Sequence, residues 1–149
     1  TKDNKEHVNQ LFLMNGIPKK NIEILDIEHK NIHKNIKKFD FLIFSCFENI
    51  SIKASMPTKI GESLLSGVPI ICNNFNEDIY NLIKNDKVGI IVDFKKYDVK
   101  TVINKINIYL QDDSHKLRCR TIGERYFSLS SAVKNLGGLY NSLCKKIYQ

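Results

Sequence analysis

The sequence lacks the features that mark membrane-spanning and secreted proteins. Its longest apolar runs, 41–44 and 68–72, are far below the ~20 residues needed to cross a bilayer, and no signal peptide opens the chain. The four cysteines stand far apart, with no Cys-x-x-Cys pair among them. We therefore expect a cytoplasmic protein with reduced, mostly buried thiols.

Arginine is also scarce, although the chain is basic. Lysine supplies nearly all of the net charge of +7, since Arg118, Arg120 and Arg125 are the only arginines. Proteins that bind base edges rely on bidentate arginine, whereas lysine is a point charge that suits phosphate or a membrane surface. We expect no nucleic-acid partner, and we keep peripheral binding to the inner face of the membrane as an alternative location.

The hydrophobic pattern alternates between strand and helix along the chain. With 42% hydrophobic and 26% charged residues, the composition is that of a globular domain with a packed core. The pattern predicts strands at 22–25, 41–44, 69–72 and 89–92 and helices at 4–15, 32–36, 58–66, 77–84 and 99–110. A helical tail follows from about 114, broken near Ser128 to Ser130 and weakened by Gly137-Gly138. No internal repeat, linker or second domain is visible.

This alternation predicts an α/β fold, a Rossmann-like parallel sheet with helices on both faces. Segment 41–44 is too apolar for a half-exposed strand, so we expect it to be central and covered on both faces. Ligands bind such sheets at the carboxyl ends of the strands.

The most informative segment, Ser55 to Ile71, leads from a loop through a helix into a strand. The helix N-terminus presents unpaired N–H groups and a partial positive charge, which suit a diphosphate. Lys59 and Glu62 share one face, so that Lys59 can meet phosphate oxygens while Glu62 accepts hydrogen bonds from a ribose diol. The alternative is a surface helix with a weak Lys–Glu pair, worth a few tenths of a kcal/mol.

The segment resembles the donor-binding signature of retaining glycosyltransferases with the GT-B fold (family 4-like, glycosyl transferases group 1). In that family Pro-Thr-Lys-x-x-Glu-x-x-x-x-Gly-x-Pro-x-Ile is a common variant. This chain matches it throughout, at Pro57, Thr58, Lys59, Glu62, Gly67, Pro69 and Ile71. The resemblance extends over roughly 22–110, which includes the strand at 88–92.

The resemblance implies a role for each matching residue. Glu62 is then the ribose-binding glutamate, and backbone amides around Pro57, Thr58 and Lys59 hold the pyrophosphate. The loop near Ile27 corresponds to the family's base-contacting loop. Many members carry a second glutamate near the transferred sugar, where this chain has Ala54, and Ser55 or Lys53 is a candidate replacement.

A further candidate, Glu77, lies in the polar loop 73–78 after a core strand, where the alternative is a helix cap. His29 and His33 are four apart but lack a third metal ligand, so we expect no metal site.

The resemblance implies a hexosyltransferase-type enzyme that transfers a sugar, with retention, from a nucleoside diphosphate sugar to a glycan or lipid-linked acceptor. It needs no cofactor. Residues 1–149 correspond to a partial donor-binding domain, without the upstream strands and the N-terminal acceptor domain. We therefore expect an incomplete sheet or a gap filled by a neighbouring chain, and no turnover by the isolated chain. The alternative is a non-catalytic nucleotide-binding α/β domain.

Overall fold

A computed structural model describes residues 4–47 and 49–147 of the chain. It divides into two compact units, Thr1–Ile32 and His33–Gln149. No linker or change of composition marks this division in the sequence. The first unit holds α1 (Lys5–Met14), η1 (Lys19–Asn21) and η2 (His29–Asn31), and α2 (Ile32–Ile36) spans the boundary.

The first unit confirms the predicted helix but not the predicted strand. Asn4 caps α1 by accepting a hydrogen bond from the Glu6 N–H at 2.9 Å. Residues 22–25 were predicted to form a strand, and this prediction is wrong: they are irregular chain between η1 and η2. Ile22 and Ile24 are half-buried and Glu23 and Leu25 are exposed, as in a strand. The pattern sets the alternation of side chains, but a strand also needs a hydrogen-bonded neighbour.

The second unit is built on a three-stranded parallel sheet. Its strands are β1 (Leu42–Phe44), β2 (Ile70–Cys72) and β3 (Gly89–Ile91), in the order β1-β2-β3. The helices are α3 (Ile50–Lys53), α4 (Thr58–Leu65), α5 (Glu77–Asp86), α6 (Val99–Leu110), α7 (His115–Phe127) and α8 (Leu129–Ile147). This arrangement confirms the predicted fold class, an incomplete Rossmann-like α/β sheet.

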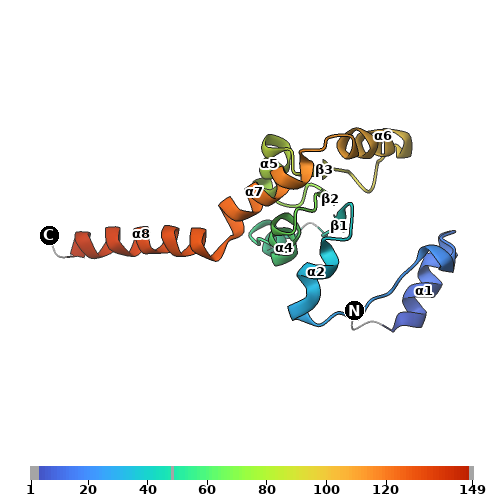
Figure 1. The fold of residues 1–149 in the computed structure, drawn as a ribbon, viewed down its shortest axis with the longest axis horizontal. Coiled ribbons are helices and arrows are strands. Elements are labelled where there is room, and N and C mark those ends of the chain that lie inside the picture. Colours follow the sequence, from blue (N-terminus) through green and yellow to red (C-terminus); the bar gives the residue numbers. More distant parts are fainter. Residues whose placement is uncertain (1–3, 48, 148–149) are drawn as a thin grey trace. The chain divides into compact units, whose positions relative to one another are not determined.

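Helices cover both faces of this sheet (Figure 1). One face carries the larger core, in which α4, α5 and α7 pack on β2 through Ile60, Leu64, Ile70, Cys72, Phe75, Ile79, Ile83, Val88, Cys119 and Ile122. On the other face, Ile71, Ile90 and Val92 meet the half-buried stripe of α6, formed by Val102, Ile106 and Tyr109. The sheet is therefore the middle of three layers.

The central strand is β2 rather than the predicted segment 41–44. All three residues of β2 are buried, whereas Ile43 in β1 is 68% exposed. Within the described residues, β1 pairs only with β2, because residues 22–25 do not join the sheet. The prediction that 41–44 is central and covered on both faces is thus wrong, and β1 is an edge strand of the described sheet.

The second half of the segment Ser55 to Ile71 ends α4 and leads the chain into β2. Gly67 has φ +77°, a left-handed conformation that glycine adopts without steric cost. Its N–H donates to the Leu64 carbonyl oxygen at 2.9 Å, and the Val68 N–H donates to that of Ser63 at 2.9 Å. The buried Ser63 Oγ donates to the Val68 carbonyl oxygen at 2.9 Å. Gly67 therefore has a structural role in this chain.

Two glycines allow α4 and α7 to pack closely. A Cβ placed on Gly123 of α7 would lie 2.6 Å from the Leu65 nitrogen of α4. A Cβ on Gly61 of α4 would lie 2.9 Å from Phe127 Cδ1. The Gly123 clash is with backbone, so no side-chain rotation relieves it, and a larger residue there must push the helices apart.

Gly123→Ala should therefore lower the free energy of unfolding by about 1–3 kcal/mol, the usual cost of overpacking. The matched control is Gly138→Ala in α8, where no described atom outside the helix lies within 4 Å of the added Cβ. That change should add about 0.5–1 kcal/mol, because alanine favours a helix interior more than glycine does. Urea unfolding of both variants measures the difference, and equal effects would contradict the close packing.

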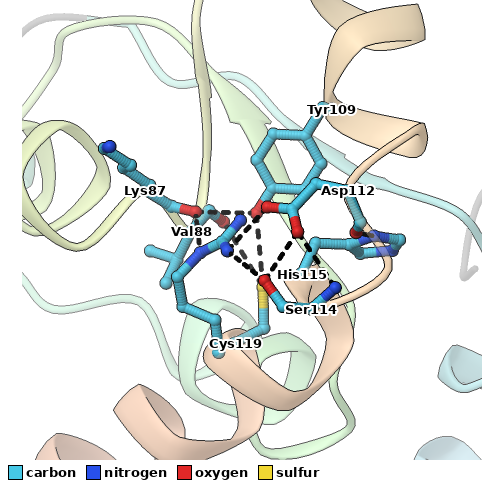
Figure 2. Close-up of polar contacts among 8 residues, drawn as sticks. Lys87, Val88, Tyr109, Asp112, Ser114, His115 and Cys119 are labelled. Carbon is cyan, nitrogen blue, oxygen red and sulfur yellow. Dashed lines mark hydrogen bonds and ion pairs between the residues drawn. The ribbon is translucent and has the colours of Figure 1, made fainter.

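A polar cluster holds the corner between α6 and α7 against the turn before β3 (Figure 2). The Lys87 carbonyl oxygen accepts hydrogen bonds from Tyr109 Oη and Arg118 Nε, both at 2.9 Å. Arg118 Nη1 also lies 2.7 Å from Asp112 Oδ2, and Ser114 Oγ donates to Asp112 Oδ1 at 2.6 Å. These groups satisfy one another, so the cluster has a structural role.

The pKa of Asp112 is lowered to about 2, first by hydrogen bonding to Ser114 and then by Arg118. A depressed folded-state pKa contributes stability above the ordinary aspartate range, and this contribution is lost as the pH falls toward 2. Asp112→Asn should therefore unfold with a weaker pH dependence between pH 5 and 2 than the native protein. Its exposed neighbour provides the control: thermal unfolding of Asp113→Asn should keep the native pH dependence.

Candidate functional site

The three strands end beside a cavity of about 610 Å³. The segment after each strand lines it: Ser45, Cys46 and Phe47 after β1, Asn73 and Asn74 after β2, and Asp93, Phe94, Lys95 and Lys96 after β3. Carboxyl ends of parallel strands lie on the same edge of a sheet, and this is where open α/β sheets bind ligands. The cavity is therefore the candidate site.

Two asparagines from the loop after β2 fix the chain that leads into α4. Asn73 accepts from the Cys46 N–H at 3.1 Å and donates to the Cys46 carbonyl oxygen at 2.8 Å. Asn76 donates to the carbonyl oxygens of Lys53 and Ser55 at 2.8 and 3.0 Å, and it caps α5 through the Ile79 N–H. The polar loop 73–78 therefore caps α5 and also holds the segment before α4 by hydrogen bonds to its backbone.

The N-terminus of α4 has no side-chain cap within the described residues. Pro57 occupies the cap position in an extended conformation. Its carbonyl oxygen accepts a hydrogen bond from the Ile60 N–H at 3.0 Å. By contrast, Asn or Asp side chains cap α1, α3, α5 and α6. Helix-end amides without a side-chain cap, here those of Thr58 and Lys59, suit an anion, and the predicted diphosphate contact stays a prediction.

Lys59 and Glu62 project from the part of α4 that is not buried. The predicted buried face is confirmed, since Ile60 and Leu64 are fully buried. Glu62 is half-buried, and the exposed Lys59 lies close enough to the cavity to act on Cys46. Burial raises the pKa of the Cys46 thiol, and the positive charge of Lys59 lowers it. The charge of Lys59 is therefore in electrostatic range of the thiol that follows β1.

The other predicted residues differ in how the structure places them. Ser55 is half-buried just before α4, and its Oγ donates to the Ile52 carbonyl oxygen at 3.0 Å. Glu77 is exposed at the first position of α5 and lines a separate hollow of about 660 Å³ that also includes Lys53 and Asn74. Ile27 belongs to the first unit, whereas α4 belongs to the second.

Sequence reasoning missed the turn after β3 as part of the site. The Asp93 side chain accepts from the Lys95 N–H at 2.9 Å, and the Asp93 carbonyl oxygen accepts from the Lys96 N–H at 3.1 Å. This tight turn places two lysines on the wall of the cavity. Their position directly after a predicted strand was the available signal, because such residues face the ligand crevice.

Comparison with protein-family models, curated proteins and solved structures finds no match to this chain. The function must therefore be argued from its own residues. No three His, Cys, Asp or Glu residues among those described are grouped so as to hold a metal ion. The four cysteines are free: Cys72 and Cys119 are buried, Cys46 is half-buried and Cys144 is exposed. The predicted burial of the thiols therefore holds fully for two of the four.

The influence of Lys59 on Cys46 can be measured through the alkylation rate of the thiol. In a Cys144→Ser background, Lys59→Met should raise the Cys46 pKa, because it removes the cation that favours the thiolate. The pH–rate profile for iodoacetamide should then move to higher pH. Cys72 should stay unreactive, since it is buried and its pKa is raised to about 12. Lys53→Met is the control, and an equal shift from this variant would contradict the position assigned to Lys59.

Proposed function

We propose that this chain binds a nucleoside diphosphate sugar and forms the donor-binding part of a retaining glycosyltransferase. The acceptor in this proposal is a glycan or a lipid-linked sugar. The observation that carries it is the uncapped N-terminus of α4, with the exposed Lys59 and the half-buried Glu62 on its first turns and with Lys59 in electrostatic range of Cys46, which lines the cavity. The donor signature in the sequence starts at this same helix end.

The diphosphate is assigned to the helix end and the lysines around it. The free amides at the start of α4 supply hydrogen-bond donors, and the helix dipole adds a partial positive charge. Lys59 lies in the first turn of α4, and Lys95 and Lys96 line the cavity wall. In sugar transfer the leaving diphosphate gains negative charge as the glycosidic bond breaks. Fixed amides and lysines at this position stabilise that charge.

The ribose is assigned to Glu62. This carboxylate lies one helical turn beyond the anion-binding amides, and its half-buried position limits competition from water. A carboxylate can accept two hydrogen bonds from a vicinal diol, and such charge-assisted bonds are stronger than neutral ones. Glu62 therefore supplies recognition of the nucleoside, whereas the amides and Lys59 supply recognition of the phosphates.

A second candidate function is nucleotide binding without transfer, and Ala54 favours it. This exposed residue ends α3, at the position where the glycosyltransferases that the chain resembles carry a sugar-binding glutamate. Ser55 does not replace that carboxylate directly, because its hydroxyl donates to the Ile52 carbonyl oxygen. Equal affinity for uridine diphosphate and its sugar conjugates would support this second function.

The donor site is tested with uridine and guanosine diphosphates and the corresponding nucleosides. Glu62→Ala should weaken both the diphosphate and the bare nucleoside roughly ten- to a hundred-fold, since a lost charge-assisted hydrogen bond is worth about 1.5–3 kcal/mol. Lys59→Ala should weaken only the diphosphate, and by less, because salt screens an exposed lysine. Isothermal titration of each of the four ligands against the native chain and both variants measures these affinities.

The matched control is Glu124→Ala, which removes an exposed helical glutamate paired with Arg120 on α7. It should leave every affinity unchanged. If Glu62→Ala also left both ligands unaffected, α4 would be only a structural helix and the donor site would be ruled out. Circular dichroism of all variants separates a lost contact from a lost fold.

A further inference from the structure

The last helix carries an exposed apolar stripe that the rest of the described chain leaves uncovered. Six apolar side chains of α8 are 48–81% exposed, and each has another of the six three or four residues away: Leu129, Val133, Leu136, Leu139, Tyr140 and Leu143. This spacing places them on one side of the helix. α8 packs mainly on α7, next to the junction where Ser131 Oγ donates to the Arg125 carbonyl oxygen at 2.6 Å.

The positive charge of the protein is concentrated in the same region. Residues 114–149 carry seven Lys or Arg against one Glu, a net charge of +6. Residues 1–113 carry 16 Lys or Arg against 15 Asp or Glu, a net charge of +1, so the C-terminal segment supplies most of the total of +7. The segment of α8 itself contains Lys134, Lys145 and Lys146 and no acidic residue. An apolar stripe and an excess of lysine over acidic residues thus occur in one helical segment.

Two other partners that could cover the apolar stripe, a second copy of α8 and a nucleic acid, fit these observations less well. A second copy of α8 could use the spacing of Leu129, Val133, Leu136, Tyr140 and Leu143 as a coiled-coil seam. However, the segment has no acidic side chain to pair with the partner's lysines, so two copies bring only like charges together. A nucleic acid would match the charge but would leave the apolar side chains in water, since its affinity comes mainly from phosphate contacts.

We propose that α8 binds the surface of an anionic phospholipid bilayer. The helix lies in the plane of the interface, with its apolar stripe at the boundary between headgroups and acyl chains. The cations of the segment are attracted by the negative surface potential of the lipid. No described helix is long and apolar enough to cross a membrane, so this contact is with one leaflet. The proposal is independent of the nucleotide site, which lies on other elements.

The test is flotation of the full chain with vesicles of phosphatidylcholine alone or mixed with phosphatidylglycerol. The native chain should partition onto the mixed vesicles, and added salt should weaken this binding. Leu136→Ser should reduce the partition coefficient by at least about ten-fold, the effect of losing one buried apolar side chain. Lys134→Gln should reduce it about five-fold on the mixed vesicles, the effect of one cation near the surface.

Two matched variants serve as controls because they change exposed residues on other helices: Leu117→Ser on α7 and Lys100→Gln on α6. Both should bind the mixed vesicles as the native chain does. Equal binding to the two vesicle types would overturn the proposal. The proposal would also be overturned if Lys134→Gln lost binding while Leu136→Ser kept it. That result would indicate a site for polyanions in general. Sedimentation equilibrium without lipid tests whether a second copy of the chain covers the stripe. If the native chain were a dimer that Leu136→Ser dissociates, and it bound no vesicles, the membrane proposal would also be overturned.

Discussion

The close packing of α4 against α7 is the contact on which the rest of the second unit depends. Gly61 and Gly123 remove the side chains that would separate the two helices, and Leu64 and Ile122 fill the core beneath them. α4 is thereby held in the core through Ile60 and Leu64, which pack with β2. The exposed first turn of this helix is the anion site that we propose.

The loops at the carboxyl edge add a second, polar constraint. Asn73 and Asn76 bond to the backbone of the segment that precedes α4, so the loop after β2 holds the loop after β1. Buried or half-buried amides of this kind are satisfied by backbone groups, which gives the loops a single conformation. A site built from backbone amides needs this order, because the donors must be in place before the ligand arrives.

The two proposals assign different ligands to different parts of the same basic chain. Lys95 and Lys96 line the cavity, and the first turns of α4 carry Lys59 and the half-buried Glu62, groups suited to a small ligand with phosphate and hydroxyl groups. Along α8, cations accompany a continuous apolar stripe, an arrangement suited to an extended surface. If both hold, the donor site belongs to a protein that works at a membrane, where lipid-linked acceptors are found.

The sequence by itself determined the local elements: the helix at 58–66, its end at Gly67, its buried Ile60 and Leu64, and the strands at 41–44, 69–72 and 89–92 all follow from periodicity and backbone preference. Only the tertiary structure decided which strand is central, that residues 22–25 stay outside the sheet, that Asn76 bonds to the segment before α4, and that the turn at Asp93 lines the candidate cavity. The physical reason is that periodicity and capping act between neighbours along the chain. Strand pairing, the clamp on the loops and the exposure of α8 depend on residues far apart in sequence, whose contacts leave no local pattern.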